Sequence, residues 1–452
     1  MDSLIYWRQM GWGLAALNSI PFFLFLFLVA VLPFLSATAH WWEKNPNKFY
    51  VSVFFALVGV ALCLVPTRDA ARVLHSYLDY WAFLSVMGAL YVVSGGIHIL
   101  GVYEGFPFVN TLFLAFGALL SNVLGTTGAS MLLIRPLLHA NRHRKHKSHI
   151  LVFFIFIVSN SAACLIPLGP PLYLGYLKGV PFFWTLHLLP QCGLAVGLLL
   201  VLFHFIDGRI FEKEEVESKG RMSLEIHLAA RKIYVRGWTN VIFLVLIIGA
   251  ILFSGYILQP LLSGVFGGEW VDIGSKGFQV AALGLLAFGS YRTTPKAIHQ
   301  LNHFHFAPLQ EVAILFFGIF GAMIPPLALL EAKGPAAALT QPWQYFWVSG
   351  VLSAFLDNAP AYLNFTTLAS TQFGVASNHL GELAAKSPRI LTAISCGTSF
   401  MGALTYIGNG PNFMVKAIAE HYRVKMPSFG GYMVWSLAVL TPVFLIVTFL
   451  FF

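Results

Sequence analysis

One polar, helix-breaking stretch interrupts an otherwise apolar part of the sequence. LSAFLDNAPAYLNF, residues 352–365, places the carboxylate of Asp357 beside the amide of Asn358, with Pro360 three residues further on. A carboxylate at the centre of a bilayer costs at least about 2.5 kcal/mol, so it is expected to face a polar cavity. Carboxylate, amide and freed carbonyl oxygens suit a small cation, and burial lets a proton compete for the same carboxylate. The stretch therefore predicts a cation or proton site, or, as the alternative, a helix N-cap at Asp357.

A second polar interruption, SNVLGTTGAS at residues 121–130, has a constant relation to the first. Adding 232 to each residue number matches the two stretches in four pairs: Ser121 with Ser353, Gly125 with Asp357, Thr126 with Asn358, and Gly128 with Pro360. This constant offset predicts an internal duplication. Hydroxyl and amide groups at the two interruptions are candidate cation or substrate ligands: Ser121, Asn122, Thr126, Thr127, Ser353 and Asn358.

Two further apolar segments are broken in the same paired way. CLIPLGPPLYLG at residues 164–175 corresponds to TYIGNGPNFMVK at residues 405–416, with Gly169-Pro170 matching Gly410-Pro411. The polar or flexible residues at or just before these breaks complete the set of substrate-site candidates, together with Gly125: Asn160, Gly169, Asn409, Gly410 and Asn412. The alternative is that their amides and hydroxyls only satisfy backbone groups freed at the kinks, and for Asn160 this role is favoured.

The elements that carry these residues are predicted from composition and segment length. Hydrophobic residues make up 58% of the chain and charged residues 10%, which is typical of a polytopic membrane protein with no separate soluble domain. The apolar runs are continuous rather than alternating, so an all-α fold is expected. Ten spanning helices are predicted near residues 19–37, 48–66, 78–99, 149–180, 182–206, 238–258, 273–290, 309–330, 388–418 and 433–452.

Two apolar segments do not fit this alternating count. Residues 108–138 and 342–371 each contain a polar break near the middle, and each is predicted to be a re-entrant hairpin. Five spans and one hairpin per half give an odd number of crossings, so the second copy is predicted to be inverted. The predicted units are 1–206, a charged cytoplasmic linker at 207–237, and 238–452. Within the linker, MSLEIHLAARKIYV (222–235) is predicted to lie along the inner membrane surface.

Charge gives a predicted orientation. The net charge is +9, and HANRHRKHKSH at residues 139–149 is a short basic loop. The predicted helices place most Lys and Arg on one side, which the positive-inside rule assigns to the cytoplasm. Both termini are then periplasmic, in a bacterial-type inner (plasma) membrane, and the first apolar run is a retained helix rather than a removed signal peptide. Lipid headgroup, metal or nucleic-acid binding by the basic loop are weaker alternatives.

Other residues favour structural roles. The four cysteines, Cys63, Cys164, Cys192 and Cys396, lie singly in apolar segments, so neither a disulfide nor a zinc site is predicted. Glu311 is expected to interact with a helix N-terminus rather than to couple ions, and His98 and His187 to be interfacial or core side chains. No nucleophile and base pair, metalloprotease motif or phosphate loop is visible. No cofactor and no enzymatic activity are expected.

Five stretches in the same order carry a family resemblance. They are LSAFLDNAPAYLNF, GTTGASMLLIRPLL, PPLYLGYLKGVPFFW, EVAILFFGIFGAMIP and TYIGNGPNFMVKAIAE. Together the stretches resemble the ion transporter superfamily, in particular the branch of NhaD/ArsB-type sodium:proton antiporters and citrate transporters. The resemblance covers most of the chain from about residue 80 onward. It implies an elevator-like mechanism, in which hairpins and broken helices slide against a scaffold, and commonly a homodimer.

One departure from the family pattern concerns the first broken helix. Relatives commonly read GGxLTPLGDPP, whereas this chain has SAACLIPLGPP at residues 161–171 and lacks the acid between Gly169 and Pro170. A cation site that depends on that acid would have lost a ligand. Asp357 is then the only acid predicted to lie at a break.

The favoured function is secondary active exchange of a monovalent cation, most simply sodium, for protons, with Asp357 binding each in turn. The alternative is transport of citrate, another carboxylate or an oxyanion, held by half-helix N-termini and by Asn and Thr side chains. A channel or membrane-embedded enzyme ranks third. The expected partners are a small ion or carboxylate, the lipid bilayer and a second copy of the chain, without nucleic acid.

Overall fold

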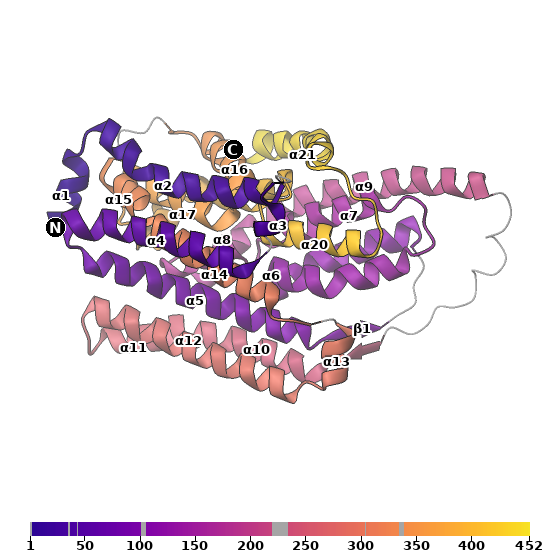
Figure 1. Ribbon diagram of the computed structural model, residues 1–452, viewed down its shortest axis with the longest axis horizontal. Coiled ribbons are helices and arrows are strands. Elements are labelled where there is room, and N and C mark those ends of the chain that lie inside the picture. Colours follow the sequence, from indigo (N-terminus) through magenta and orange to yellow (C-terminus); the bar gives the residue numbers. More distant parts are fainter. Residues whose placement is uncertain are drawn as a thin grey trace.

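The computed structural model describes residues 2–34, 37–42, 44–100, 105–218, 234–302, 304–333 and 339–452. Within these ranges nearly all elements are helices, and the long ones lie roughly along one axis of an elongated molecule (Figure 1). Eight helical segments of the described chain are long and apolar enough to cross a membrane, and Gly13–Val29 and Ser148–Ser161 are shorter apolar helices. The predicted polytopic helical membrane protein is confirmed.

The elements of the first part of the chain are α1 (Asp2–Gln9), α2 (Trp12–Val31), η1 (Leu32–Phe34), α3 (Ala39–Trp42), α4 (Asn45–Thr67), α5 (Ala70–Gly95), β1 (His98–Leu100), α6 (Pro107–Ala140), α7 (Ser148–Phe156), η2 (Ile157–Ser161), α8 (Pro170–Leu177), η3 (Phe182–Leu188) and α9 (Leu189–Ser218). Those of the second part are β2 (Tyr234–Arg236), α10 (Trp238–Phe253), η5 (Ser254–Leu258), α11 (Gln259–Ser263), α12 (Gly268–Thr293), α13 (Lys296–Leu301), α14 (Ala307–Ala322), α15 (Ile324–Lys333), α16 (Pro342–Leu356), α17 (Asn358–Gln372), α18 (Leu380–Lys386), α19 (Pro388–Met401), η7 (Gly402–Leu404), α20 (Gly410–His421) and α21 (Phe429–Phe451).

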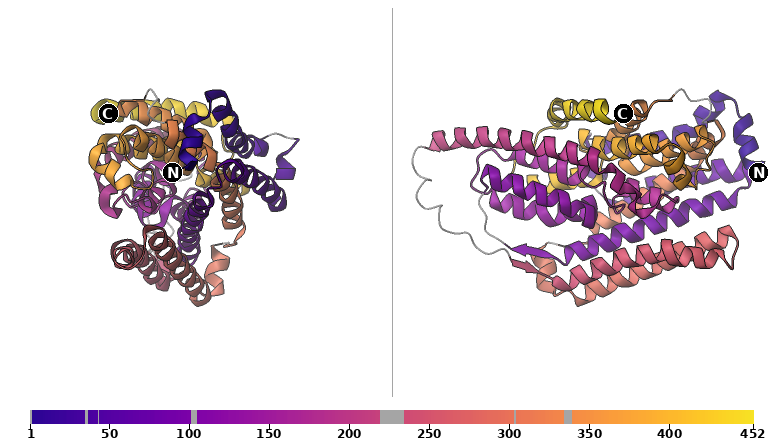
Figure 2. Two further views of the ribbon diagram at one scale, coloured as in Figure 1. Left: turned by 90° about the vertical axis from the view of Figure 1, so that its left-hand side faces the viewer. Right: turned by 180° about the vertical axis from the view of Figure 1, so that it is seen from behind.

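The helices predicted as spans correspond to observed helical segments. The two predicted broken spans are broken in the structure: residues 149–180 form α7, the π-helical turn η2 and α8, while residues 388–418 form α19, η7 and α20. Helices α10 and α12 lie beside α5 at one side of the molecule, as Figure 2 shows. Helix α5 also packs against α6 and α14, so it contacts elements from both parts of the chain.

The predicted all-α class is confirmed, and one short β-ladder accompanies the helices of the described chain. Strand β1 pairs antiparallel with β2, and His98 lies opposite Arg236. Three residues per strand are too few for the alternation of polar and apolar side chains that identifies a strand in a sequence. The ladder joins the end of α5 to the start of α10.

The predicted linker begins inside a helix. Helix α9 continues to Ser218, so residues 207–218 extend a membrane helix. Most of the segment predicted to be amphipathic, 222–235, lies outside the described residues, and only β2 at its end is described.

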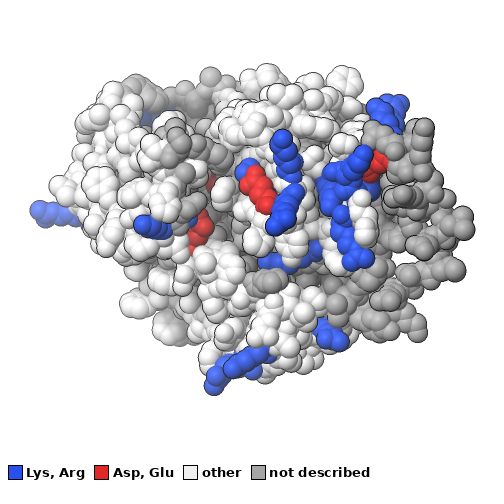
Figure 3. Space-filling model, turned by 45° about the vertical axis from the view of Figure 1, so that its right-hand side comes forward, with Lys and Arg blue, Asp and Glu red and all other residues white. Residues whose placement is uncertain are grey.

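Part of the basic loop at residues 139–149 is buried and forms ion pairs. Arg144 is buried and pairs with two carboxylates, Asp207 Oδ1 at 2.7 Å and Glu214 Oε2 at 2.6 Å. His149 Nε2 lies 2.8 Å from Asp207 Oδ1, and Asn110 Nδ2 donates to Asp207 Oδ2 at 3.0 Å. Figure 3 shows that most charged side chains visible on this side of the molecule are Lys or Arg. This is the side predicted to face the cytoplasm.

A disulfide corrects the prediction made from the cysteines. Cys164 and Cys192 are bonded, with Cα atoms 6.8 Å apart, whereas Cys63 and Cys396 are buried thiols. The two bonded residues lie in separate apolar segments, and their separation of 28 positions carries no recognisable spacing. Only the packing of the first broken helix against α9 brings them together.

Candidate functional site

The first polar interruption forms the tip of a helical hairpin. Helix α6 is continuous by hydrogen bonding except at Gly125, where φ is 69° and ψ is 168°. A straight helix of 34 residues would be about 51 Å long. Its two ends instead meet: Gly105 N donates to Ala140 O at 3.0 Å, and Asn110 Nδ2 donates to Asn141 Oδ1 at 3.0 Å. The chain therefore reverses at Gly125, as predicted for residues 108–138.

The second interruption has the same backbone shape. Helices α16 and α17 are joined through Asp357, where φ is 70° and ψ is 150°. The ends of this hairpin also meet, because the Tyr345 hydroxyl donates to the Gln372 side chain. Residues that carry a side chain rarely adopt this backbone conformation, which glycine populates readily. Asp357 thus occupies a strained turn at the position that matches Gly125.

Asp357 has the capping contact that the sequence offered as an alternative. Its Oδ1 accepts a hydrogen bond from Ala359 N at 3.3 Å, at the N-terminus of α17. The residue is half-buried. No Lys, Arg or His of the described chain forms an ion pair with it. A capping role therefore accounts for one contact of the carboxylate and leaves its charge without a counterion.

The side-chain amide of the next residue, Asn358, contacts oxygen atoms from three segments. The outer end of the Asn358 side chain lies 2.7 Å from Ser353 Oγ, 2.8 Å from Gly408 O and 3.0 Å from Thr398 O. With its nitrogen at this position, the amide donates to all three. The amide therefore satisfies oxygens on the first half of the hairpin, on α19 and on the segment before α20. Candidates Ser353 and Asn358 are thus brought together.

The three asparagines of the broken helices also meet. Asn160 Nδ2 donates to Asn412 Oδ1 at 2.7 Å, and Asn409 Nδ2 donates to Ser159 O at 2.7 Å. Asn412 Nδ2 in turn donates to Gly402 O and Thr405 O, each at 2.9 Å. These contacts satisfy carbonyl groups at η2 and η7, which is the backbone role that the sequence allowed. They also join the two breaks across about 250 residues of chain.

The candidates of the first hairpin lie around its own tip. Asn122 Oδ1 accepts from Leu165 N at 2.8 Å, and Ser121 donates to Ala118 O at 2.8 Å. The Thr126 hydroxyl is buried without a hydrogen-bond partner among the described residues, and Thr127 is half-buried. Gly169 precedes α8 with an extended backbone. These residues do not line the cavity that Asp357 lines.

That cavity has a volume of about 1030 Å³. Asp357, Asn409 and Gly410 lie on its wall, together with Met131 and Leu132 of α6 but not Gly125 or Thr126. The structure therefore brings three candidates of the second half to one cavity and leaves those of the first hairpin outside it.

Two cationic side chains that the sequence reasoning missed line the same cavity. Lys48 Nζ pairs with Glu311 Oε1 at 2.6 Å, so these charges compensate each other. Arg135 is half-buried and forms a hydrogen bond with Tyr422, and no carboxylate of the described chain pairs with it. A basic residue inside an apolar segment was the available signal. The uncompensated charges on the wall are the Arg135 guanidinium and the Asp357 carboxylate.

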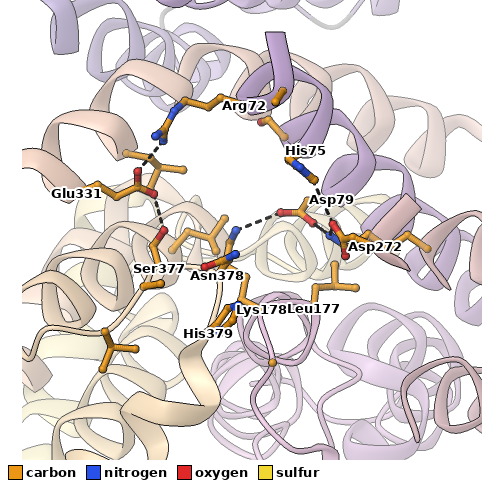
Figure 4. A pocket seen from close by; sticks show the side chains of 18 of the residues that line it. Arg72, His75, Asp79, Leu177, Lys178, Asp272, Glu331, Ser377, Asn378 and His379 are labelled. Carbon is orange, nitrogen blue, oxygen red and sulfur yellow. Dashed lines mark hydrogen bonds and ion pairs between the residues drawn. The ribbon is translucent and has the colours of Figure 1, made fainter. Parts of the chain in front are cut away.

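A second cavity, of about 1320 Å³, lies at the other end of α5. Its wall carries ion pairs between residues far apart in the sequence, among them Arg72 with Glu331 and Lys276 with Asp79 (Figure 4). The sequence reasoning missed these residues, although Asp79 and Lys276 are charged residues within predicted spans. Partners on separate spans cannot be assigned from spacing alone.

Aromatic side chains of α5 and α14 lie between the two cavities. The rings of Phe83 and Phe316 stack with centroids 4.7 Å apart, and those of Tyr80 and Phe320 are 5.9 Å apart. Phe316 lines the cavity of Asp357, and Phe320 lines the other. About one turn of α14 therefore separates a residue that lines one cavity from a residue that lines the other.

Two helical hairpins and two interrupted helices within a multi-pass membrane body define a secondary transporter. Residues 12–452 match the model of a family described as "Putative citrate transport". The chain belongs to this family, which is part of the ion transporter superfamily that the motifs resemble. No protein of curated function matches the sequence.

Proposed function

We propose that this transporter carries a small organic anion with more than one carboxylate, of the citrate class, and couples its movement to a cation. The observation that carries this proposal is the cavity of about 1030 Å³, whose uncompensated charges are Arg135 and Asp357. Sites for small organic molecules have volumes of roughly 300–1,000 Å³, and a bare ion needs far less space. The family description supports the same substrate class.

Arg135 supplies the group that recognises the anion. A guanidinium donates two parallel hydrogen bonds to a carboxylate, which gives both charge compensation and orientation. Arg135 lies on the returning helix of the first hairpin, ten residues beyond its tip at Gly125. An anion bound there lies on the path between the hairpin and the end of the molecule that carries the basic loop.

The second hairpin supplies the coupling site. Asp357 accepts the cation or a proton at the tip of this hairpin. The adjacent Asn358 amide ties the tip to Ser353, Thr398 and Gly408. Binding at this tip changes the charge and the hydrogen bonding of the strained turn. The site then links occupancy by the ion to the position of the hairpin.

Alternating access is supported by two cavities that lie on either side of the aromatic side chains of α5 and α14. The matching backbone at Gly125 and Asp357 supports two repeated halves, 1–206 and 238–452. Their inverted orientation is part of this proposal and rests on the odd number of crossings predicted for each half. In this arrangement the hairpins and broken helices move against α5, α10 and α12, with the elevator-like motion that the family resemblance implies.

Exchange of sodium for protons remains a second candidate, because Asp357 lines the cavity without a cationic partner. In that case the same carboxylate binds sodium and a proton alternately, and Arg135 has no substrate to bind. The two candidates differ in whether a carboxylate is transported.

Flux measurements on purified protein in proteoliposomes separate these candidates. We expect uptake of radiolabelled citrate or a related di- or tricarboxylate that depends on an imposed sodium or proton gradient. Liposomes without protein are the control. The antiport candidate would replace the proposal if the protein exchanged sodium for protons in the absence of carboxylates and took up no carboxylate.

Arg135→Gln is expected to raise the KM for the transported carboxylate about tenfold or more, because a hydrogen bond to a charged group contributes roughly 1.5–3 kcal/mol. Arg135→Lys should retain the charge and lose the paired geometry, with an intermediate KM. Initial uptake rates over a range of substrate concentrations measure the effect. The matched control is Arg142→Gln, since Arg142 is exposed on the basic loop. An unchanged KM in Arg135→Gln would exclude substrate binding by Arg135.

A further inference from the structure

Two buried or partly buried carboxylates on the wall of the second cavity have similar sets of hydrogen-bond and ion-pair partners. Asp79 accepts from Lys276 Nζ at 2.6 Å and from Lys178 Nζ at 3.3 Å. Glu331 pairs with Arg72 Nη1 at 2.7 Å and accepts from the Ser377 hydroxyl at 2.5 Å. Figure 4 shows the contacts of Glu331 with Arg72 and Ser377, and that of Asp79 with Lys178, at the edge of the cavity. Each carboxylate therefore has two donors: Asp79 has two lysines, and Glu331 has an arginine and a hydroxyl group.

One donor to each carboxylate, Lys276 for Asp79 and Arg72 for Glu331, comes from the side of the cavity formed by α5 and α12. Asp79 and Arg72 lie on α5, Lys276 lies on α12, and α12 packs along the length of α5. Helix α15, which carries Glu331, also contacts α5. The Lys276 and Arg72 contacts therefore join elements that already pack against one another.

The second donor to each carboxylate comes from the opposite side of the cavity. Lys178 follows α8, and Ser377 follows α17 at the far end of the second hairpin. These two segments are bonded to each other, because Leu380 N donates to Lys178 O at 2.7 Å. Lys178 and Ser377 thus belong to one connected unit. Its helices also pack against the other side, α8 against α5 and α17 against α15, and Lys178 and Ser377 add polar contacts across the edge of the cavity.

We propose that Lys178 with Asp79 and Ser377 with Glu331 are two reversible latches, which hold the transporter in the present arrangement and release when the second cavity opens. Release leaves neither carboxylate without a partner, because Lys276 stays on Asp79 and Arg72 stays on Glu331. A buried charge that loses its only partner is strongly destabilising. The doubled partners remove this obstacle to motion. Lys178 is 20% exposed, so water can solvate its ammonium group after release.

The latches are functional residues of the transport cycle that no candidate site includes. The proposal rests on the proposed alternating-access transport, and it concerns neither the substrate nor the coupling ion. Its consequence is an equilibrium between two arrangements, which the latch contacts bias. Removing one contact shifts this equilibrium by the free energy that the contact contributes to the latched arrangement.

Thiol labelling of single introduced cysteines in detergent-solubilised protein tests the latches. Leu363→Cys reports on the second cavity, and Leu315→Cys reports on the cavity of Asp357. In the Lys178→Met background we expect labelling at position 363 to become roughly fivefold faster and labelling at position 315 to become slower, as for a typical allosteric coupling. The parent with buried Cys63 and Cys396 gives the background rate.

The opposite changes at the two positions separate a latch from a structural contact, because a loosened fold would accelerate labelling at both. Lys178→Arg should restore the parent rates. Lys386→Met is the matched control, since Lys386 is exposed and lies 3.8 Å from Glu382. If Lys178→Met does not fold, Ser377→Ala should give a smaller change in the same direction.

Equal rates in the parent and the latch variants at both positions would overturn the proposal. The labelling uses no substrate and no gradient. A failure of the proposed carboxylate transport therefore appears in the flux measurement, and a failure of the latches appears in the labelling.

Discussion

Asp357→Gly is expected to raise the thermal stability of the protein and to abolish coupled transport. The turn at Asp357 has φ of 70° and ψ of 150°, a conformation that costs a residue with a side chain about 1–3 kcal/mol. Glycine removes this strain and lowers capping stability by only a few tenths of a kcal/mol. The same change deletes the carboxylate that we propose holds the coupling ion.

Asp357→Asn removes the charge at position 357 and keeps a side chain that can form the same helix cap. Asparagine keeps most of the side-chain volume and also caps helices well. If Asp357 were only a cap, this variant would transport normally. We expect instead that gradient-driven uptake falls about 100-fold or more, in the range of losses seen when an essential electrostatic contact is removed, while the protein still inserts and folds.

Thermal unfolding in detergent and uptake by proteoliposomes measure the two effects. Gly125→Ala is the matched control for the turn, because Gly125 has φ of 69° and its substitution should lower stability. A less stable Asp357→Gly protein would show that the turn is not strained. Wild-type gradient-driven flux in Asp357→Asn would eliminate Asp357 as the coupling residue.

Arg144→Met is expected to lower the free energy of unfolding by about 3–5 kcal/mol, because it leaves buried carboxylates without their cation. Asp207 is fully buried and Glu214 is 8% exposed, and Arg144 pairs with both. Its guanidinium also donates to Gly105 O at 2.9 Å, next to the two ends of the first hairpin. The loss should therefore loosen the base of that hairpin.

Chemical or thermal unfolding of the purified protein measures this loss. Arg142→Met removes an equal charge from the same loop at an exposed position, and it should change stability by less than about 0.5 kcal/mol. A similar small effect for both variants would mean that the buried network contributes little.

Local breaks in the fold could be predicted from the sequence. A run of apolar residues interrupted by glycine, proline and polar side chains cannot continue as an ordinary membrane helix, and this predicted the reversals at Gly125 and Asp357 and the interruptions near Gly169 and Gly410. The offset of 232 also paired two residues that share one backbone conformation. These features depend on short stretches of chain, so the sequence contains most of the necessary information.

Contacts between distant spans could not be predicted in this way. Lys48 pairs with Glu311 across 263 positions, and Asp79 pairs with Lys276 across 197. The charge of each residue was visible, but the identity of its partner depends on which helices pack side by side. The same limit explains the missed bond between Cys164 and Cys192 and the separation of the Asp357 cavity from Thr126 and Thr127.

The two hairpin turns have one backbone shape and different residues. The shape alone is satisfied by glycine, so an acid at position 357 works against the folding preference of its own turn, whereas glycine at position 125 does not. In a set of related sequences, position 125 would therefore report on whether the hairpin can form. Under the coupling role that we propose for Asp357, position 357 would report on whether the transporter couples to an ion. A relative with glycine at both positions would keep the architecture and belong to a different physiological class, such as an uncoupled facilitator.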